Sequence, residues 1–213
     1  MTVQACAELV ERADPDRFLA AMAAPPKARG VLFPIYAYNV EVSRAPWLTQ
    51  ETMIAEMRLQ WWRDALAEIA ERKEPRAHEV VTSLSGLDRL DTGTLDRIAI
   101  ARRWDIYRDP FEDAEAFEDY LDDTAAGLMW VAAQGLGAQD MSEVVVRNFG
   151  WASALASFLV AVPELSARNR RPLFSEAPAW VRTIAEARLG RLDRGRKDID
   201  LVPREARPAL YAG

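Results

Sequence analysis

The stretch that decides the fold is Leu32-Phe33-Pro34-Ile35-Tyr36-Ala37-Tyr38-Asn39-Val40-Glu41-Val42-Ser43-Arg44. At helical spacing it is apolar nearly all the way round, and a helix of that kind belongs inside a protein. Two polar side chains, Asn39 and Glu41, fall within it and need partners if they are buried. We therefore predict a buried helix over 27–44 that carries polar groups into the interior.

The rest of the chain also has helical rather than strand periodicity. Prolines, glycines and capping residues divide it into segments of helical length. This pattern predicts an all-α fold of roughly seven or eight helices. The expected helices cover 3–23, 27–44, 50–72, 77–84, 94–107, 112–135, 142–162 and 178–193.

The length and composition fit one soluble globular domain. Half of the 213 residues are apolar and 28% are charged. We expect the helical domain to cover 1–195 and a weakly ordered tail to cover 196–213. Cys6 is the only cysteine and His78 the only histidine, which excludes an intrachain disulfide and multi-histidine metal sites. No run approaches the ~18 apolar residues of a membrane span, and we find no secretory signal.

The charge is unevenly distributed. The net charge of −6 argues against general nucleic-acid binding. Residues 165–213 carry 11 basic and 6 acidic residues, whereas residues 1–164 have a net charge of −11. The basic segment is either a solvated helix or a surface for phosphates, anionic lipid or an acidic partner. We expect a cytoplasmic protein, with a peripheral position at the inner face of the cytoplasmic membrane as an option.

One arginine falls within an apolar helix face. On the helix at 50–70, Arg58 lies in the stripe that contains Trp61 and Trp62. A buried arginine must be paired or must line a wet cavity. We expect Glu41 to be its partner; alternatively, Arg58 extends past the tryptophan rings to the surface.

A local acidic cluster, Asp119, Asp122 and Asp123, lies on the helix at 112–135. Asp119 and Asp123 are four residues apart, the spacing of two magnesium-binding carboxylates on one helix face. They lie opposite the apolar stripe, however, and this favours a solvated polar face.

The order and spacing of several motifs resemble the squalene/phytoene synthase family over roughly residues 8–175. The resemblance implies the isoprenoid-synthase fold, a single all-α domain. In enzymes of this family, two prenyl diphosphates are condensed in its central cavity. In such enzymes, paired aspartates on two facing helices hold Mg²⁺, which stabilises the departing pyrophosphate. The matching segments are Asp16-Arg17-Phe18-Leu19, Pro25-Pro26 with Arg29, 32–38, 58–66, Phe117-Glu118-Asp119-Tyr120, Ala125-Ala126-Gly127 and Gly150.

The positions that the resemblance matches to the two aspartate motifs carry other residues. The first motif falls on Ser43 and Trp47, and the second on Ser157, Ala161 and Leu165. Tryptophan, alanine and leucine supply no carboxylate oxygen for Mg²⁺. We therefore predict no metal site and no cofactor, with Mg²⁺ needed only if catalysis persists.

The resemblance also suggests which residues line the cavity. Tyr36 and Tyr120 match cavity tyrosines of the family. We expect Asn39, Glu41 and Arg58 to join them as cavity or ligand-binding residues.

Within the family, Asn39-Val40-Glu41 and Met57-Arg58-Leu59-Gln60-Trp61 most resemble the branch that acts in respiratory complex I assembly. Our preferred hypothesis is a non-catalytic protein that works in this assembly. Its expected partners are assembly intermediates, a membrane surface, or an isoprenoid or lipid ligand, and not nucleic acid.

Two rival hypotheses remain open. One is a working prenyltransferase in isoprenoid biosynthesis that draws its metal ligands from Asp119, Asp122 and Asp123 or from Glu164. The other is an isoprenoid or lipid carrier that uses the same cavity without chemistry.

Overall fold

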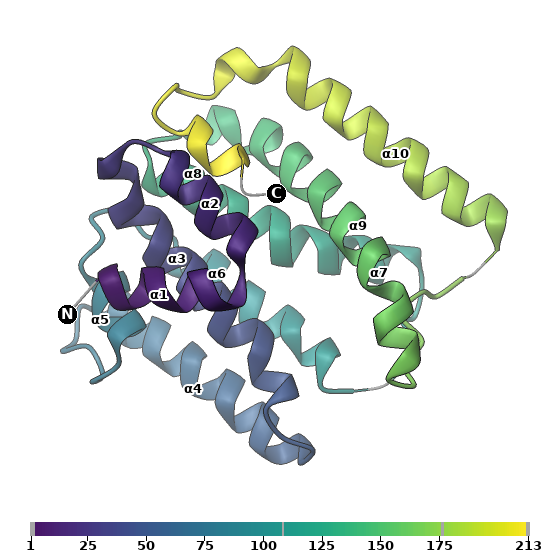
Figure 1. Ribbon diagram of the computed structural model, residues 1–213, viewed down its shortest axis with the longest axis horizontal. Helices are drawn as coiled ribbons and strands as arrows, with labels where there is room; N and C mark the ends of the chain where they lie inside the picture. Colours follow the sequence, from purple (N-terminus) through teal and green to yellow (C-terminus); the bar gives the residue numbers. More distant parts are fainter. Residues whose placement is uncertain (1–2, 108, 176, 212–213) are drawn as a thin grey trace.

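The computed structural model describes residues 3–107, 109–175 and 177–211, and every regular element in these ranges is helical (Figure 1). The all-α prediction is therefore confirmed. The α-helices are α1 (Val3–Ala13), α2 (Pro15–Ala23), α3 (Pro26–Arg44), α4 (Thr52–Ala70), α5 (Glu79–Ser85), α6 (Thr92–Ala101), α7 (Ala114–Leu121), α8 (Gly127–Gly135), α9 (Glu143–Ala167) and α10 (Pro178–Lys197). Short 3-10 turns are η1 (Ala45–Trp47), η2 (Arg102–Asp105), η4 (Asp140–Ser142), η5 (Ile199–Leu201) and η6 (Arg207–Tyr211).

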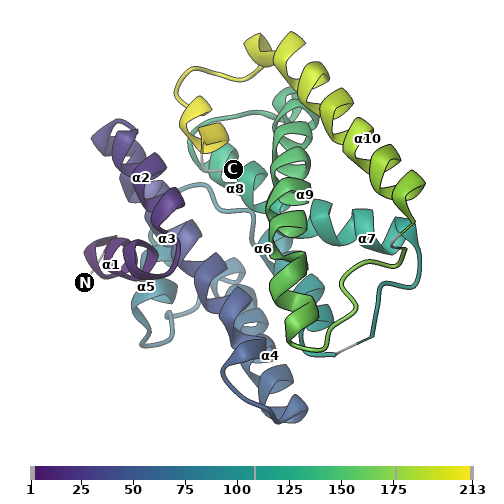
Figure 2. The same cartoon turned by 45° about the vertical axis from the view of Figure 1, so that its right-hand side comes forward.

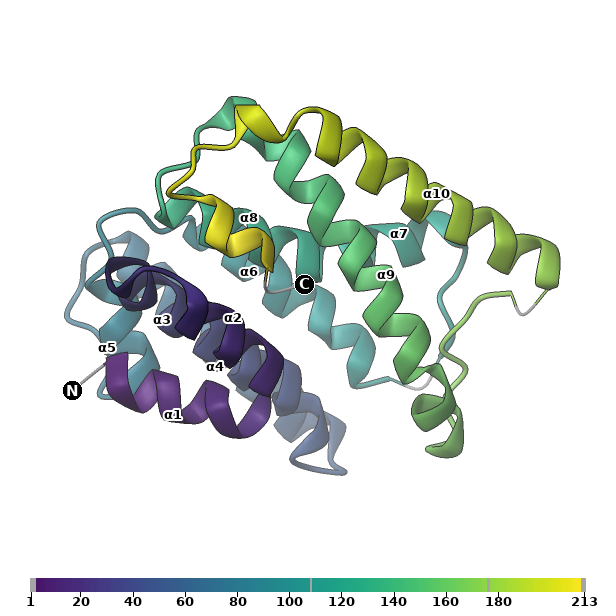
Figure 3. The ribbon, with the colours of Figure 1, turned by 45° about the horizontal axis from the view of Figure 1, so that its top comes forward.

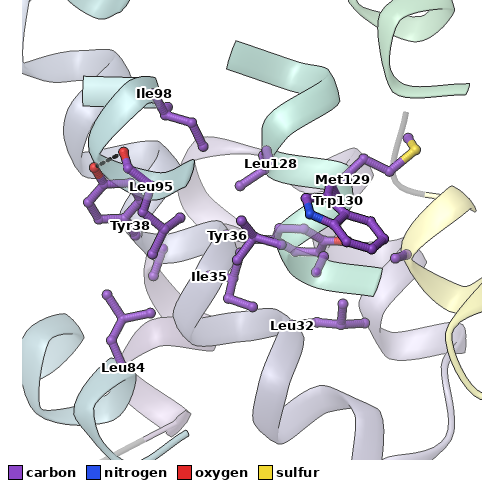
Figure 4. Close-up of a cluster of buried hydrophobic side chains, with 14 of the residues drawn as sticks. Leu32, Ile35, Tyr36, Tyr38, Leu84, Leu95, Ile98, Leu128, Met129 and Trp130 are labelled. Atoms are coloured by element: carbon purple, nitrogen blue, oxygen red, sulfur yellow. Dashed lines mark hydrogen bonds between the residues drawn. The ribbon is translucent and has the colours of Figure 1, made fainter. Parts of the chain in front are cut away.

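Helix α3 forms the centre of the molecule. Eleven of its nineteen residues are buried, so the prediction of a buried helix is confirmed. Its side chains pack against α6 and α8, as the labelled residues of Figure 4 show. The Tyr38 hydroxyl donates a hydrogen bond to the Leu95 carbonyl at 2.8 Å, which joins α3 to α6. Truncating a fully buried side chain here, such as Leu32, would destabilise the fold by about 2–5 kcal/mol.

The first predicted helix is two helices in the structure. Asp14 ends α1, and Pro15 begins α2, where its missing N–H does no harm. The Asp14 carboxylate accepts a hydrogen bond from the Arg17 backbone N–H at 3.1 Å and so caps α2. The prediction of one helix over 3–23 overlooked this cap.

The predicted helix over 112–135 is also interrupted, here by a π-helical turn over Asp122–Ala126. Helix α9 packs directly on this turn. A Cβ atom built on Gly150 would lie 2.6 Å from the Ala126 Cα, closer than real contacts allow. Gly150 is therefore what permits the two backbones to approach. Such π-helical turns often occur at functional sites.

Helix α9 extends past Pro163 to Ala167, five residues beyond the predicted end. Pro163 is exposed and lies within the helix. The helix over Asp140–Ala167 contains an 18-residue window with a mean hydropathy of 1.5, so by length and composition alone it could cross a membrane, which we did not expect. This is weak evidence, because 44% of the apolar window is buried inside the protein and α8 and α10 pack along the helix (Figure 2).

The C-terminal segment, whose residues 196–213 we expect to be weakly ordered, packs on the body of the protein over its described residues. Helix α10 lies along α9, and η6 returns against α2 and α8 (Figure 3). Val202 and Ala206 are fully buried, and the Ser142 hydroxyl donates a hydrogen bond to the Leu201 carbonyl at 2.7 Å. Single apolar residues between charged ones anchor this segment, and they give no periodic signal in the sequence.

Candidate functional site

A pocket of about 320 Å³ is lined by residues of α3 and α9. Tyr36, Asn39 and Ser43 form the α3 wall, and Trp47 of η1 continues it. Their spacing of three or four residues places them on one face. The α9 wall has the same spacing, and α7, the π-helical turn and α8 close the remaining side. The α9 residues are Gly150, Ser153, Ala154, Ser157, Phe158, Ala161 and Leu165.

The structure brings together most of the residues that the sequence singled out. Both walls include positions that the resemblance matched to aspartate motifs, and they lie around one pocket. The predicted residues that line it are Tyr36, Asn39, Ser43, Trp47, Tyr120, Ser157, Ala161 and Leu165.

Glu41 and Arg58 do not line this pocket, and their predicted pairing is wrong. Glu41 pairs with Arg44, with 3.1 Å between Oε1 and Nη2. Arg58 is exposed on α4. Arg58 lies one turn before the buried Trp62 and on nearly the same helix face, so helical phase alone does not explain this exposure.

The α3 wall presents one buried polar atom that lacks a partner within the described residues. The Tyr36 side chain is only 1% exposed, and its hydroxyl makes no hydrogen bond within the described part of the chain. Burial raises the pKa of Tyr36 far above its ordinary value, so the hydroxyl stays protonated and can donate. Asn39 is 6% exposed and lies one turn further along the same face.

Another part of the pocket lining holds a polar network of Arg102, Asp105 and Tyr120, in which the buried Arg102 Nε–H has no hydrogen-bond partner within the described residues. The Arg102 guanidinium donates to the Tyr120 hydroxyl at 2.6 Å and lies 3.3 Å from the Asp105 carboxylate. The Tyr120 hydroxyl donates to Asp105 at 3.1 Å. Burial raises the pKa of Asp105, and the charge of Arg102 opposes that shift.

Arg102 and Asp105 were missed in the sequence. Opposite charges three residues apart, directly after the apolar helix α6, are the signal that could have identified them.

Each pocket-lining cation has an acidic partner. Arg102 pairs with Asp105, and Arg17 of α2 forms an ion pair and hydrogen bond with Asp14. Arg170 lies just outside and stacks on Trp47, with its guanidinium carbon 4.7 Å from the ring centroid. It also donates to the backbone carbonyls of Asp105 in η2 and of Tyr107, the latter at 2.6 Å, so its charge fixes η2 and Trp47 in place.

Comparison with known proteins identifies the family and the fold of this chain. A sequence profile of the squalene/phytoene synthase family matches residues 10–176. The chain belongs to the squalene/phytoene synthase family. A crystal structure of a dehydrosqualene synthase in complex with a ligand superposes with a TM-score of 0.82 at 16% identity, covering 99% of this chain and 82% of that one. The expected isoprenoid-synthase fold is confirmed.

The curated relatives of this squalene/phytoene synthase family member are named as complex I assembly factors. The Drosophila melanogaster complex I assembly factor 6 homolog is 30% identical over 179 residues, which is 78% of this chain and 52% of the relative. The human complex I assembly factor 6 is 23% identical over 168 residues, again 78% of this chain and 50% of the relative. The chain thus spans about half the length of these relatives.

The acidic cluster of Asp119, Asp122 and Asp123 does not line the pocket. Asp122 pairs with Arg147 at 2.9 Å, and Asp123 with Arg97 at 3.7 Å. Partial burial raises the pKa of Asp123, opposed by Arg97. Neither they nor Asp119 line the pocket, and no group of three or more metal-binding side chains occurs within the described ranges.

Proposed function

We propose that this protein is a non-catalytic member of the squalene/phytoene synthase family that acts in respiratory complex I assembly. The main support is its similarity over 78% of its length to relatives named complex I assembly factor 6. Because the chain spans about half of those relatives, the proposal concerns the part that is shared.

The donor set of the pocket supports the absence of prenyl-diphosphate chemistry. Mg²⁺ prefers several carboxylate or other hard oxygen ligands in near-octahedral geometry. The pocket lining contains one carboxylate, Asp105, which Arg102 and Tyr120 already engage. These residues do not fit a Mg²⁺–diphosphate cluster, and we derive no catalytic step through one.

A deletion strain of the source organism tests the assembly role. We expect complex I to be missing or reduced on a native gel, with the other respiratory complexes unchanged, and the intact gene to restore it. Normal complex I in the deletion strain would contradict the proposal.

A double variant separates the proposal from the prenyltransferase alternative. Asp119→Asn with Asp123→Asn removes two carboxylates that the rival enzyme would need but leaves side-chain volume unchanged. We expect this variant to restore complex I as well as the wild type does. Mg²⁺-dependent release of pyrophosphate from farnesyl diphosphate by the wild type, lost in this variant while it stays folded, would favour the enzyme.

We also propose that the protein is cytoplasmic and works at the inner face of the cytoplasmic membrane. This follows from the assembly role, because complex I is embedded in a membrane. Cell fractionation should find it in the soluble fraction and, at low salt, partly on membranes. Its recovery only from an extracellular or periplasmic fraction would contradict this localisation.

A further inference from the structure

Two polar parts of the pocket lining differ in what they offer a ligand. In one, Arg102, Asp105 and Tyr120 bond to one another and only the Arg102 Nε–H is left without a partner. In the other, the buried Tyr36 hydroxyl has no hydrogen-bond partner within the described residues, although buried polar groups in proteins are normally paired. Tyr36 lines the pocket, so an oxygen atom of a bound molecule could supply the missing acceptor.

The uncharged polar groups of the two pocket walls lie along the helices beside Tyr36, and the charged groups near its hydroxyl, Arg17 and Asp14, are paired with each other. Asn39 and Ser43 follow Tyr36 on α3, and Ser153 and Ser157 line the facing α9 wall. The charged lining residues are Arg17, Arg102 and Asp105, and each arginine already has an acidic partner. A ligand with several negative charges would therefore meet no surplus positive charge, and burying unpaired charge is strongly unfavourable.

The remaining surface is apolar. Leu121, Leu128, Met129, Phe158 and Leu165 line the rest of the pocket. The volume of about 320 Å³ lies at the lower end of the range for small-molecule sites, about 300–1,000 Å³. Such a site suits a hydrocarbon chain with one small oxygen-bearing head.

We propose that this pocket binds an uncharged amphipathic lipid, with a hydroxyl or carbonyl head that accepts a hydrogen bond from Tyr36, and that it does so without Mg²⁺. This inference rests on the proposed function, because it assigns a ligand class to the pocket of the non-catalytic protein. The head lies beside Asn39, and the chain runs along the apolar residues of α8 and α9.

Two probes with the same chain test the head-group preference: farnesol and farnesyl diphosphate. Binding to the purified full chain is measured by calorimetry, with Mg²⁺ and with EDTA. We expect farnesol to bind equally under both conditions and about tenfold or more tightly than the diphosphate. Absence of farnesol binding, or tighter binding of the diphosphate with Mg²⁺, would overturn the proposal.

A pair of variants tests the role of Tyr36. Tyr36→Phe removes the unpartnered hydroxyl and should weaken farnesol binding roughly three- to tenfold. Tyr38→Phe is the matched control on the same helix, because its hydroxyl is already bonded to Leu95 and does not line the pocket. Equal affinity of Tyr36→Phe and wild type, with both folded by thermal melting, would also overturn the proposal.

The two proposals fail separately. Normal complex I in the deletion strain, together with farnesol binding in vitro, would reject only the assembly role. Loss of complex I on deletion, together with no farnesol binding, would reject only the ligand class.

Discussion

The two polar parts of the pocket lining each include a buried tyrosine, Tyr120 in one and Tyr36 in the other, but the two hydroxyls differ in their bonding. The hydroxyl of Tyr120 both accepts from Arg102 and donates to Asp105, whereas that of Tyr36 has no partner within the described residues. Apart from the Arg102 Nε–H, the donors and acceptors around Tyr120 are engaged and stabilise the fold, whereas the Tyr36 hydroxyl is available to a ligand.

The largest effect on the free energy of unfolding should come from breaking the network of Arg102, Asp105 and Tyr120. Asp105→Ala leaves Arg102 buried without its acidic partner, which should destabilise the protein by about 3–5 kcal/mol. The control is Asp96→Ala, which breaks a half-exposed pair with Arg63 and should have an effect below about 1 kcal/mol. Urea unfolding measures both; equal effects would mean that the network is not structural.

The next effect concerns the close contact between α9 and the π-helical turn. Gly150→Ala would place a Cβ atom against the Ala126 backbone and should destabilise the protein by about 1–3 kcal/mol. Gly190→Ala is the control, because its Cβ would meet only the tip of Arg194 at 3.6 Å, and it should stabilise α10 by about 0.5–1 kcal/mol. If both variants melt at the same temperature, α9 and the π-helical turn are not as close as described.

A smaller effect distinguishes a bonded tyrosine from an unbonded one in the ligand-free protein. Tyr38→Phe leaves the Leu95 carbonyl without its donor and should destabilise the fold by about 1 kcal/mol. Tyr36→Phe removes a hydroxyl that has no partner and should be neutral or slightly stabilising. Chemical denaturation measures both, and a larger loss for Tyr36→Phe would show that its hydroxyl is satisfied after all.

The smallest effect is expected outside both regions. Arg58→Ala should change the free energy of unfolding by less than about 0.5 kcal/mol, because Arg58 is exposed and makes no ion pair among the described residues. A loss of several kcal/mol would restore the buried pair with Glu41 that the structure contradicts.

The sequence predicted the elements whose signal is local. Helix α3 is apolar nearly all round, and this alone predicts burial. The pocket residues of α3 and α9 recur at helical spacing, so their common face follows from periodicity together with the family resemblance.

The sequence could not predict features that depend on distant contacts. The π-helical turn depends on the approach of Gly150, which lies 24 residues beyond Ala126. Arg58 lies one turn before the buried Trp62, so the pattern of α4 predicts burial, and its exposure depends on which parts of the chain pack over that end of the helix. Arg170 bonds to the Asp105 carbonyl of η2 from 65 residues away, and no local pattern indicates this.

The decisive measurement is pyrophosphate release from farnesyl or geranylgeranyl diphosphate by the purified protein in the presence of Mg²⁺. We predict a rate equal to that of buffer alone, because the pocket offers no free carboxylate for the metal. Protein-dependent release that EDTA abolishes would contradict the proposition that this family fold works here without prenyl-diphosphate chemistry.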